Sequence, residues 1–259
     1  MKIAVCVKQV VARDWPLRVD EDGGWVRDAD AGFEMNEPDA YALEESLRLK
    51  ERHGGEVIVC SAGPARVGQV LREGLARGAD RAVHVESDEL GTAEPTAVGE
   101  ALADALRSES CDLVLTGLQS DDQGFGQTGV VLASALGVPH ATIIMEIEVA
   151  DGQVRVKREL EGGQFQWVTL PLPALLTIQS GINQLRYATL KGIMAARRKP
   201  VRKVTPAAPA AAGQRILRLY APEKEKRTKL FEGAPAAAAT ELVRALREEA
   251  RVLTTGDGR

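Results

Sequence analysis

The sequence predicts a protein of the α/β class, built on an open, mostly parallel, doubly wound sheet with an added β-hairpin region. Short apolar runs alternate with helical stretches over the first 145 residues, and strands alternating with helices of this length indicate βαβ units and a parallel sheet. The runs are continuously apolar, as in IAVCV (3–7) and EVIVC (56–60). Continuous runs are typical of strands that are covered on both faces.

Length and composition limit the possible classes. The chain has 259 residues, of which 44% are hydrophobic and 27% charged, with a net charge of −4. This is enough for one large domain with appendages, and the charge argues against a nucleic-acid partner. The three cysteines are an odd number in or beside apolar runs, which indicates free thiols in a reducing compartment. No run approaches the ~20 apolar residues of a membrane span, so we expect a cytoplasmic protein that is not membrane-embedded.

The first part of the chain predicts five strands and four helices. The first helix has apolar residues at Leu43 and Leu47 and ends at Gly54-Gly55, and the second ends at Gly78, as helices often do. The predicted strands are 3–7, 56–63, 81–86, 111–117 and 140–149, and the predicted helices are 37–54, 65–78, 95–110 and 130–138.

The pattern changes after residue 145. Residues 146–160 alternate around Asp151-Gly152, a favoured pair for a tight hairpin turn, and 164–180 predicts two more strands. Residues 199–214 are rich in Pro and Ala and predict an extended segment, and 232–253 predicts a terminal helix. We therefore expect a domain over 1–199 and an extended C-terminal arm over 200–259.

A polar loop, GLQSDDQGFGQTG (117–129), follows the fourth strand. Ligands of open parallel sheets bind beyond the carboxyl ends of the strands, and the loop leads into a helix whose first amides can meet a phosphate. Neither GxGxxG nor a P-loop is present, so the loop alone suits a phosphate site or a surface turn equally. SAGPAR (61–66) and MNEPDA (35–40), with Asn36 as a candidate helix cap, reach the same edge and favour a nucleotide pocket.

The sequence contains no pattern typical of a catalytic centre or a metal site. His53, His84 and His140 are scattered, without Cys or carboxylate at ligand spacing. Asp121-Asp122 suits an acid/base pair, although a turn with an N–H-capping aspartate is the favoured interpretation. We therefore expect a chain without a catalytic centre of its own.

Several motifs, in this order, resemble the β subunit of electron transfer flavoprotein over about residues 1–200. RYATLKGIMAARRK is the most specific of them. They are AVCVKQV at the start, MNEPDAYALEESLRLKE (35–51), SAGPARVGQVLREGLARGADRAVHV (61–85), DLVLTGLQSDDQGFGQTG (112–129), VKRELEGG (156–163) and RYATLKGIMAARRK (186–199).

The resemblance implies an electron carrier of fatty acid oxidation, a heterodimer whose α subunit holds the redox-active FAD. The C-terminal arm (200–259) is then expected to pack on the α subunit. The β subunit buries AMP, and the pair carries electrons from acyl-CoA dehydrogenase-type flavoenzymes to electron transfer flavoprotein-quinone oxidoreductase. In a bifurcating branch, a second FAD replaces AMP and accepts a hydride from NADH. Gln127-Thr128 matches the AMP type, although residues 123–126 read Gln-Gly-Phe-Gly where that type has Asp-Asp-Cys-Asn.

The resemblance also implies site residues. The expected nucleotide contacts are Cys6, Asn36, Glu37, Pro38, Asp39, Ala62, Gly117, Leu118, Gln119, Ser120, Asp121, Asp122, Gln123, Gly124, Phe125, Gly126, Gln127 and Thr128. The expected contacts with partner dehydrogenases are Leu190, which enters a partner's pocket, and its neighbours Arg186, Tyr187, Ile193 and Met194.

Three alternatives remain open. Spacing alone predicts that Leu190 is an ordinary helix-core residue. Glu159 matches a glutamate that affects the motion of the family's flavin domain, but an exposed hairpin charge is the simpler interpretation. A nucleotide-sensing domain of the universal-stress type shares the sheet and the Gly-rich loop, but that class is typically half this length and lacks residues 146–199.

Overall fold

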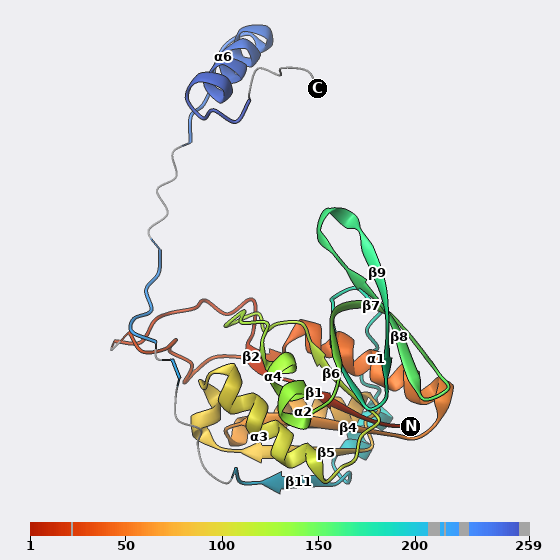
Figure 1. Cartoon of the computed structure of the whole chain (residues 1–259). Coiled ribbons are helices and arrows are strands. Elements are labelled where there is room, and N and C mark those ends of the chain that lie inside the picture. Colours follow the sequence, from red (N-terminus) through yellow and green to blue (C-terminus); the bar gives the residue numbers. More distant parts are fainter. Residues whose placement is uncertain (22, 207–212, 215, 223–227, 254–259) are drawn as a thin grey trace. The chain divides into compact units, whose positions relative to one another are not determined.

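The computed structural model describes residues 1–21, 23–206, 213–214, 216–222 and 228–253. The chain forms two compact units, Met1–Leu219 and Tyr220–Arg259 (Figure 1). The first unit contains the main sheet, and the second contains helix α6 (Pro235–Glu248), which confirms the predicted terminal helix.

The main sheet has nine strands in the order β11-β5-β4-β1-β6-β10-β7-β8-β9. All neighbours from β11 to β7 pair in parallel, and β7, β8 and β9 pair antiparallel. This confirms the predicted fold class. The strands are β1 (Lys2–Cys6), β4 (Glu56–Gly63), β5 (Arg81–Glu86), β6 (Leu113–Gly117), β7 (His140–Ala150), β8 (Gln153–Glu159), β9 (Phe165–Pro171), β10 (Ala174–Ile178) and β11 (Val201–Val204).

Helices cover both faces of the parallel strands. Ile3 and Val5 of β1 pack with α1 (Glu37–His53) and α2 (Gly68–Arg77) in one core. The alternate residues, Ala4 and Cys6, pack with α3 (Pro95–Arg107) and α4 (Thr128–Leu136) in the other. Because successive side chains of a strand point to opposite faces, the apolar runs must be continuous to serve both cores.

The order in which strands are added to the sheet reverses between β1 and β6, although these two strands are parallel. After β1 the chain builds β4 and β5 on one side, and β6 then pairs with the free edge of β1. The connections from these two strands leave in opposite directions, which opens a crevice at their carboxyl ends. Beside the crevice, β2 (Gln9–Val11) and β3 (Phe33–Met35) form a small antiparallel sheet, and β3 leads into α1.

The predicted hairpin is confirmed. β7 and β8 meet at Asp151 and Gly152, whose φ values are 51° and 74°, with Ala150 paired to Gln153. Positive φ at both turn residues suits a two-residue loop of type I′. β9 and β10 confirm the two strands predicted within 164–180.

The first unit extends beyond the predicted domain end at residue 199. β11 pairs in parallel with β5, with Val201 opposite Ala82 and Val204 opposite Val85. Residues 201–204 therefore belong to the sheet as its edge strand. The first unit continues to Leu219. Part of the predicted extended segment, residues 207–212, lies outside the described residues.

Candidate functional site

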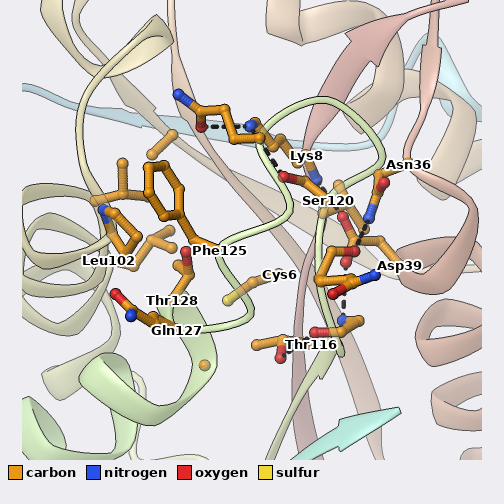
Figure 2. A pocket seen from close by; sticks show the side chains of 18 of the residues that line it. Cys6, Lys8, Asn36, Asp39, Leu102, Thr116, Ser120, Phe125, Gln127 and Thr128 are labelled. Atoms are coloured by element: carbon orange, nitrogen blue, oxygen red, sulfur yellow. Dashed lines mark hydrogen bonds between the residues drawn. The ribbon is translucent and has the colours of Figure 1, made fainter. Parts of the chain in front are cut away.

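A pocket opens where β1 and β6 end (Figure 2). One wall is polar and comes from the ends of β1 and β6, the start of α1 and the loop 118–127. The opposite wall is mostly apolar and comes from residues 90–102. Among the lining residues are Cys6, Lys8, Asn36, Asp39, Ala62, Arg66, Leu90, Ala93, Pro95, Val98, Leu102, Gly117, Leu118, Gln119, Ser120, Gln123, Phe125, Gly126, Gln127 and Thr128.

Asp39 ties the two strand ends together. Its Oδ1 accepts a hydrogen bond from the amide of Gly117 at 2.8 Å, and its Oδ2 accepts one from the amide of Lys8 at 2.7 Å. Burial raises the pKa of Asp39 to about 6, although both amide hydrogen bonds favour the ionised form. The first turn of α1 is thus fastened to the two strands that flank the crevice.

Asn36 fastens the loop rather than the helix. It takes the N-cap position of α1, but its side chain makes no capping hydrogen bond, so this part of the prediction is wrong. Its Nδ2 donates to the carbonyl of Gln119 at 3.0 Å, and its Oδ1 accepts from the amide of Asp121 at 2.9 Å. The loop satisfies both ends of the amide, and this outweighs local capping.

Lys8 organises the other side of the loop. Its Nζ donates to Asp122 Oδ1 at 2.7 Å and to Gln123 Oε1 at 2.8 Å. Although burial pushes the pKa of Asp122 upward, the charge and hydrogen bond of Lys8 hold it below its usual value. Asp122 also accepts from the amide of Gln123, and Asp121 lies 3.5 Å from Arg13. These contacts favour the structural interpretation of the Asp121-Asp122 pair.

The apolar wall faces the loop across the pocket. Leu90 lies in a short 3-10 helix (Asp88–Gly91) after β5, and Pro95, Val98 and Leu102 belong to α3. Phe125 reaches toward this wall from the loop (Figure 2), between Gly124 and Gly126, whose φ values are 64° and 63°. Glycine adopts this left-handed backbone conformation at little energetic cost, so the two glycines allow the tight turn that presents the ring.

Most of the expected nucleotide residues come together in this pocket, but some do not line it. Glu37 instead pairs with Arg13 at 2.6 Å, and Pro38 is buried in the first turn of α1. Asp121, Asp122 and Gly124 belong to the loop but do not line the pocket. Neither Lys8 nor Arg66 was among the predicted contacts, although SAGPAR (61–66) contains Arg66, and the apolar wall was missed. Lys8 directly follows the first predicted strand, so its position at a strand end was the available signal.

The segment from Arg186 to Met194 lies away from this pocket, on α1 and α2. Leu190 begins helix α5 (Leu190–Ala196) and is 77% exposed, so the helix-core alternative for Leu190 is wrong. Tyr187 is 91% exposed, and Ile193 and Met194 are also exposed. Arg186 differs, because it is bound to two carboxylates of α1.

Two further predictions can be compared with the structure. Glu159 ends β8, where it is half-buried and receives a long contact of 3.5 Å from Gln179. Within the described residues, no three His, Cys, Asp or Glu side chains gather as metal ligands. His84 is buried instead, with its ring nitrogen 3.0 Å from the carbonyl of Gly63. No helix in the described part of the chain is long and apolar enough to cross a membrane.

The fold and the site together define a doubly wound α/β protein with a ligand pocket at the switch point of its sheet. A family model described as the electron transfer flavoprotein domain matches residues 24–209. The chain is 38% identical over 261 residues to the electron transfer flavoprotein subunit beta of Methylophilus methylotrophus, covering 96% of this chain and 98% of that protein.

Other relatives are named as the same subunit. Identity is 39% over 259 residues with the subunit beta of Bradyrhizobium diazoefficiens, covering 98% of this chain and all of that protein. It is 37% over 259 residues, with the same coverage, for the mitochondrial subunit beta of Oryza sativa subsp. japonica. The chain belongs to the electron transfer flavoprotein β-subunit family. This assignment decides against the universal-stress alternative.

Proposed function

We propose that this chain pairs with an α subunit that carries FAD, and that the heterodimer carries electrons from acyl-CoA dehydrogenase-type flavoenzymes to electron transfer flavoprotein-quinone oxidoreductase. In this proposal the chain performs no bond chemistry. It holds a nucleotide, supports the flavin-bearing subunit and docks the electron donor. The proposal rests on the family and on two separate surfaces, the pocket and the exposed segment.

The pocket suits AMP. The apolar wall of Leu90, Pro95, Val98 and Leu102, with Phe125 opposite, offers a purine base a surface on which to pack. The polar wall offers hydroxyl and amide groups to a ribose and phosphate, and Thr128 begins a nine-residue helix whose first amides favour an anion. AMP would supply no redox chemistry here, and the residues that bind it also close the crevice between β1 and β6.

The exposure of Leu190 carries the docking part of the proposal. A leucine with 77% of its surface in water gains most by entering an apolar pocket of another protein. A small contact with one apolar anchor suits a brief electron-transfer encounter. Leu190→Ala should therefore slow electron transfer from the dehydrogenase and leave nucleotide content and subunit assembly unchanged.

The second unit supports the expectation that the end of the chain packs on the α subunit. None of the residues of α6, all of which are described, is buried, and Leu242 and Val243 are exposed beside each other. Deletion from Tyr220 onward leaves β11 and the whole first unit in place, so it tests the second unit alone. We expect a lower yield of heterodimer, and an unchanged yield would contradict this role.

The nucleotide experiment separates the two branches of the family. The chain is co-expressed with its α-type partner, the complex is purified and denatured, and the released nucleotides are identified by chromatography with mass detection. One FAD and one AMP per heterodimer would support the simple carrier. Two FAD and no AMP would assign the protein to the bifurcating branch, with the pocket as a flavin site that serves NADH oxidation.

A further inference from the structure

The segment Arg186–Met194, called here the docking segment, ends in a short helix that is not stable by itself. Helix α5 has seven residues, of which only Ala196 is buried. Thr189 caps it by accepting a hydrogen bond from the amide of Gly192 at 3.0 Å. Helices of this length are unstable without tertiary contacts, so contacts at the two ends of the segment must determine its conformation.

Arg186 holds the first end. Its Nε and Nη2 donate to the two oxygens of Glu44 at 2.7 and 3.0 Å, and its Nη1 and Nη2 donate to those of Glu51 at 2.6 and 3.2 Å. Its own amide also donates to Glu44 at 3.3 Å. One guanidinium thus grips two carboxylates seven residues apart on α1, a fork geometry that lysine cannot reproduce.

Two cations hold the second end. Arg72 of α2 donates to the carbonyls of Ala196 and Lys199 at 2.6 and 3.0 Å. Lys199 in turn donates to the carbonyls of Leu75 and Ala79 at 3.0 and 2.6 Å. Arg72 thus donates hydrogen bonds to carbonyls at and after the end of α5, and Lys199 donates to carbonyls at and after the end of α2. Positive charge is favourable at the C-terminal end of a helix.

The backbones of α5 and α2 also lie in close contact. A Cβ on Gly192 would lie 2.3 Å from the carbonyl oxygen of Ala76, so only glycine allows α5 to lie this close to α2. Beneath Arg186, Glu44 is 97% buried and receives a second cation, Arg48, at 2.9 Å. Burial pushes the pKa of Glu44 upward, but hydrogen bonds from Arg186 and Arg48 hold it below its usual value. Both ends of the segment are therefore tied to helices of the main core.

We propose that Arg186, Arg72 and Lys199 form a positioning clamp that holds the docking segment in one conformation before the electron donor arrives. The inference rests on the docking role proposed above. A free segment would lose backbone and side-chain freedom on binding, and this loss lowers affinity. The clamp removes that cost in advance, so Tyr187, Leu190 and Met194 present a preformed apolar surface.

Hydrogen exchange tests the clamp without any partner. The FAD-loaded heterodimer is compared with its Arg186→Gln variant, in which Glu44 keeps Arg48 and α1 keeps its support. We expect faster exchange in peptides that cover residues 187–196 and unchanged exchange elsewhere in the first unit. Arg186→Lys should lie between the two. Arg198→Gln removes one exposed positive charge from the same region and should behave as wild type, as should Leu190→Ala.

Kinetics tests whether the conformation matters. The heterodimer is titrated into an acyl-CoA dehydrogenase that is reduced by its acyl-CoA substrate, and reduction of the α-subunit FAD is followed. Arg186→Gln should raise KM for the heterodimer about tenfold and change kcat by less than about twofold, because the segment must be ordered on binding. Glu51→Gln, which removes only the outer partner, should raise KM less.

The outcomes separate the two layers of the inference. Wild-type exchange in Arg186→Gln would overturn the clamp, whatever the kinetics. Faster exchange with an unchanged KM would overturn its role in docking, provided that Leu190→Ala still raises KM. If Leu190→Ala also left KM unchanged, the docking role of the segment itself would be refuted.

Discussion

Replacing Asp39 by Asn separates two opposing contributions of the buried carboxylate. Each oxygen of Asp39 accepts one backbone amide, but asparagine has a single oxygen, so one amide would face an NH2 group. A buried donor without a partner costs about 1–3 kcal/mol. Against this, burial raises the pKa from 3.8 to about 6. This higher pKa disfavours the ionised folded state by about 3 kcal/mol.

The pH dependence has a definite sign. Because the folded chain binds the proton of Asp39 more tightly than the unfolded chain, the contribution of Asp39 to stability is fully present below about pH 4 and is lost as the pH rises through about 6. The variant has no such group. The free energy of unfolding of the wild type, minus that of Asp39→Asn, should therefore fall by about 3 kcal/mol between pH 4 and 7.5.

Urea unfolding followed by circular dichroism at several pH values measures this difference, and contributions of other titrating groups cancel in it. Near pH 4 the wild type should be clearly more stable. Near pH 7.5 the two should be similar, because the lost hydrogen bond and the removed charge offset each other. Val98→Ala is the control, since it reduces packing in the apolar wall of the same pocket without removing a charge or a hydrogen bond of Asp39. A difference that is flat, or that rises with pH, would refute the reasoning.

Two other predictions concern the same pocket. In Gly117→Ala the new Cβ would lie 2.4 Å from Asp39 Oδ1 and 2.7 Å from Pro38 Cβ, so the free energy of unfolding should fall by about 1–3 kcal/mol. Gly68→Ala, in open space with helical backbone, should instead be stabilising by up to about 1 kcal/mol in the same urea assay. In Lys8→Met the loop loses its ties to Asp122 and Gln123, so the heterodimer should retain less nucleotide after dialysis than Lys191→Met. Equal retention would contradict this role.

The sheet could be predicted from the sequence because its central strands are buried on both faces and three of the helices that cover them, α1, α2 and α4, end at glycine. β11 could not, because an edge strand is covered by a neighbour on one side only and shows just two valines among basic residues. Its partner, β5, lies about 120 residues earlier, which no local pattern reveals.

The site likewise has features that could be predicted from the sequence and features that could not. The polar loop at the end of β6 could be singled out because it follows a predicted buried strand, and open parallel sheets bind ligands beyond the carboxyl ends of their strands. The apolar wall was not, since Val98 and Leu102 have the spacing of ordinary helix-core residues. Asn36 shows the limit most clearly. Its local pattern indicates a helix cap, but a loop 83 residues away takes its hydrogen bonds.

Helix α1 serves both sites, and this raises the question of whether they are coupled. Asn36 at its start holds the pocket loop, and Glu44 holds the docking segment through Arg186. A rise of 1.5 Å per residue places these two positions about 12 Å apart along the helix. Sites beyond about 7–10 Å without shared partners usually add within about 0.5 kcal/mol.

Coupling would require that α1 itself has two arrangements which both sites bias. The hydrogen bonds of Asp39 with the amides of Lys8 and Gly117 instead fix its first turn relative to the sheet. The double variant Asn36→Ala, Arg186→Gln should therefore lose stability in urea equal to the sum of the single losses, and Arg186→Gln alone should keep its full nucleotide content. A coupling energy above about 1 kcal/mol would show that α1 moves between two positions and transmits nucleotide binding to the docking segment.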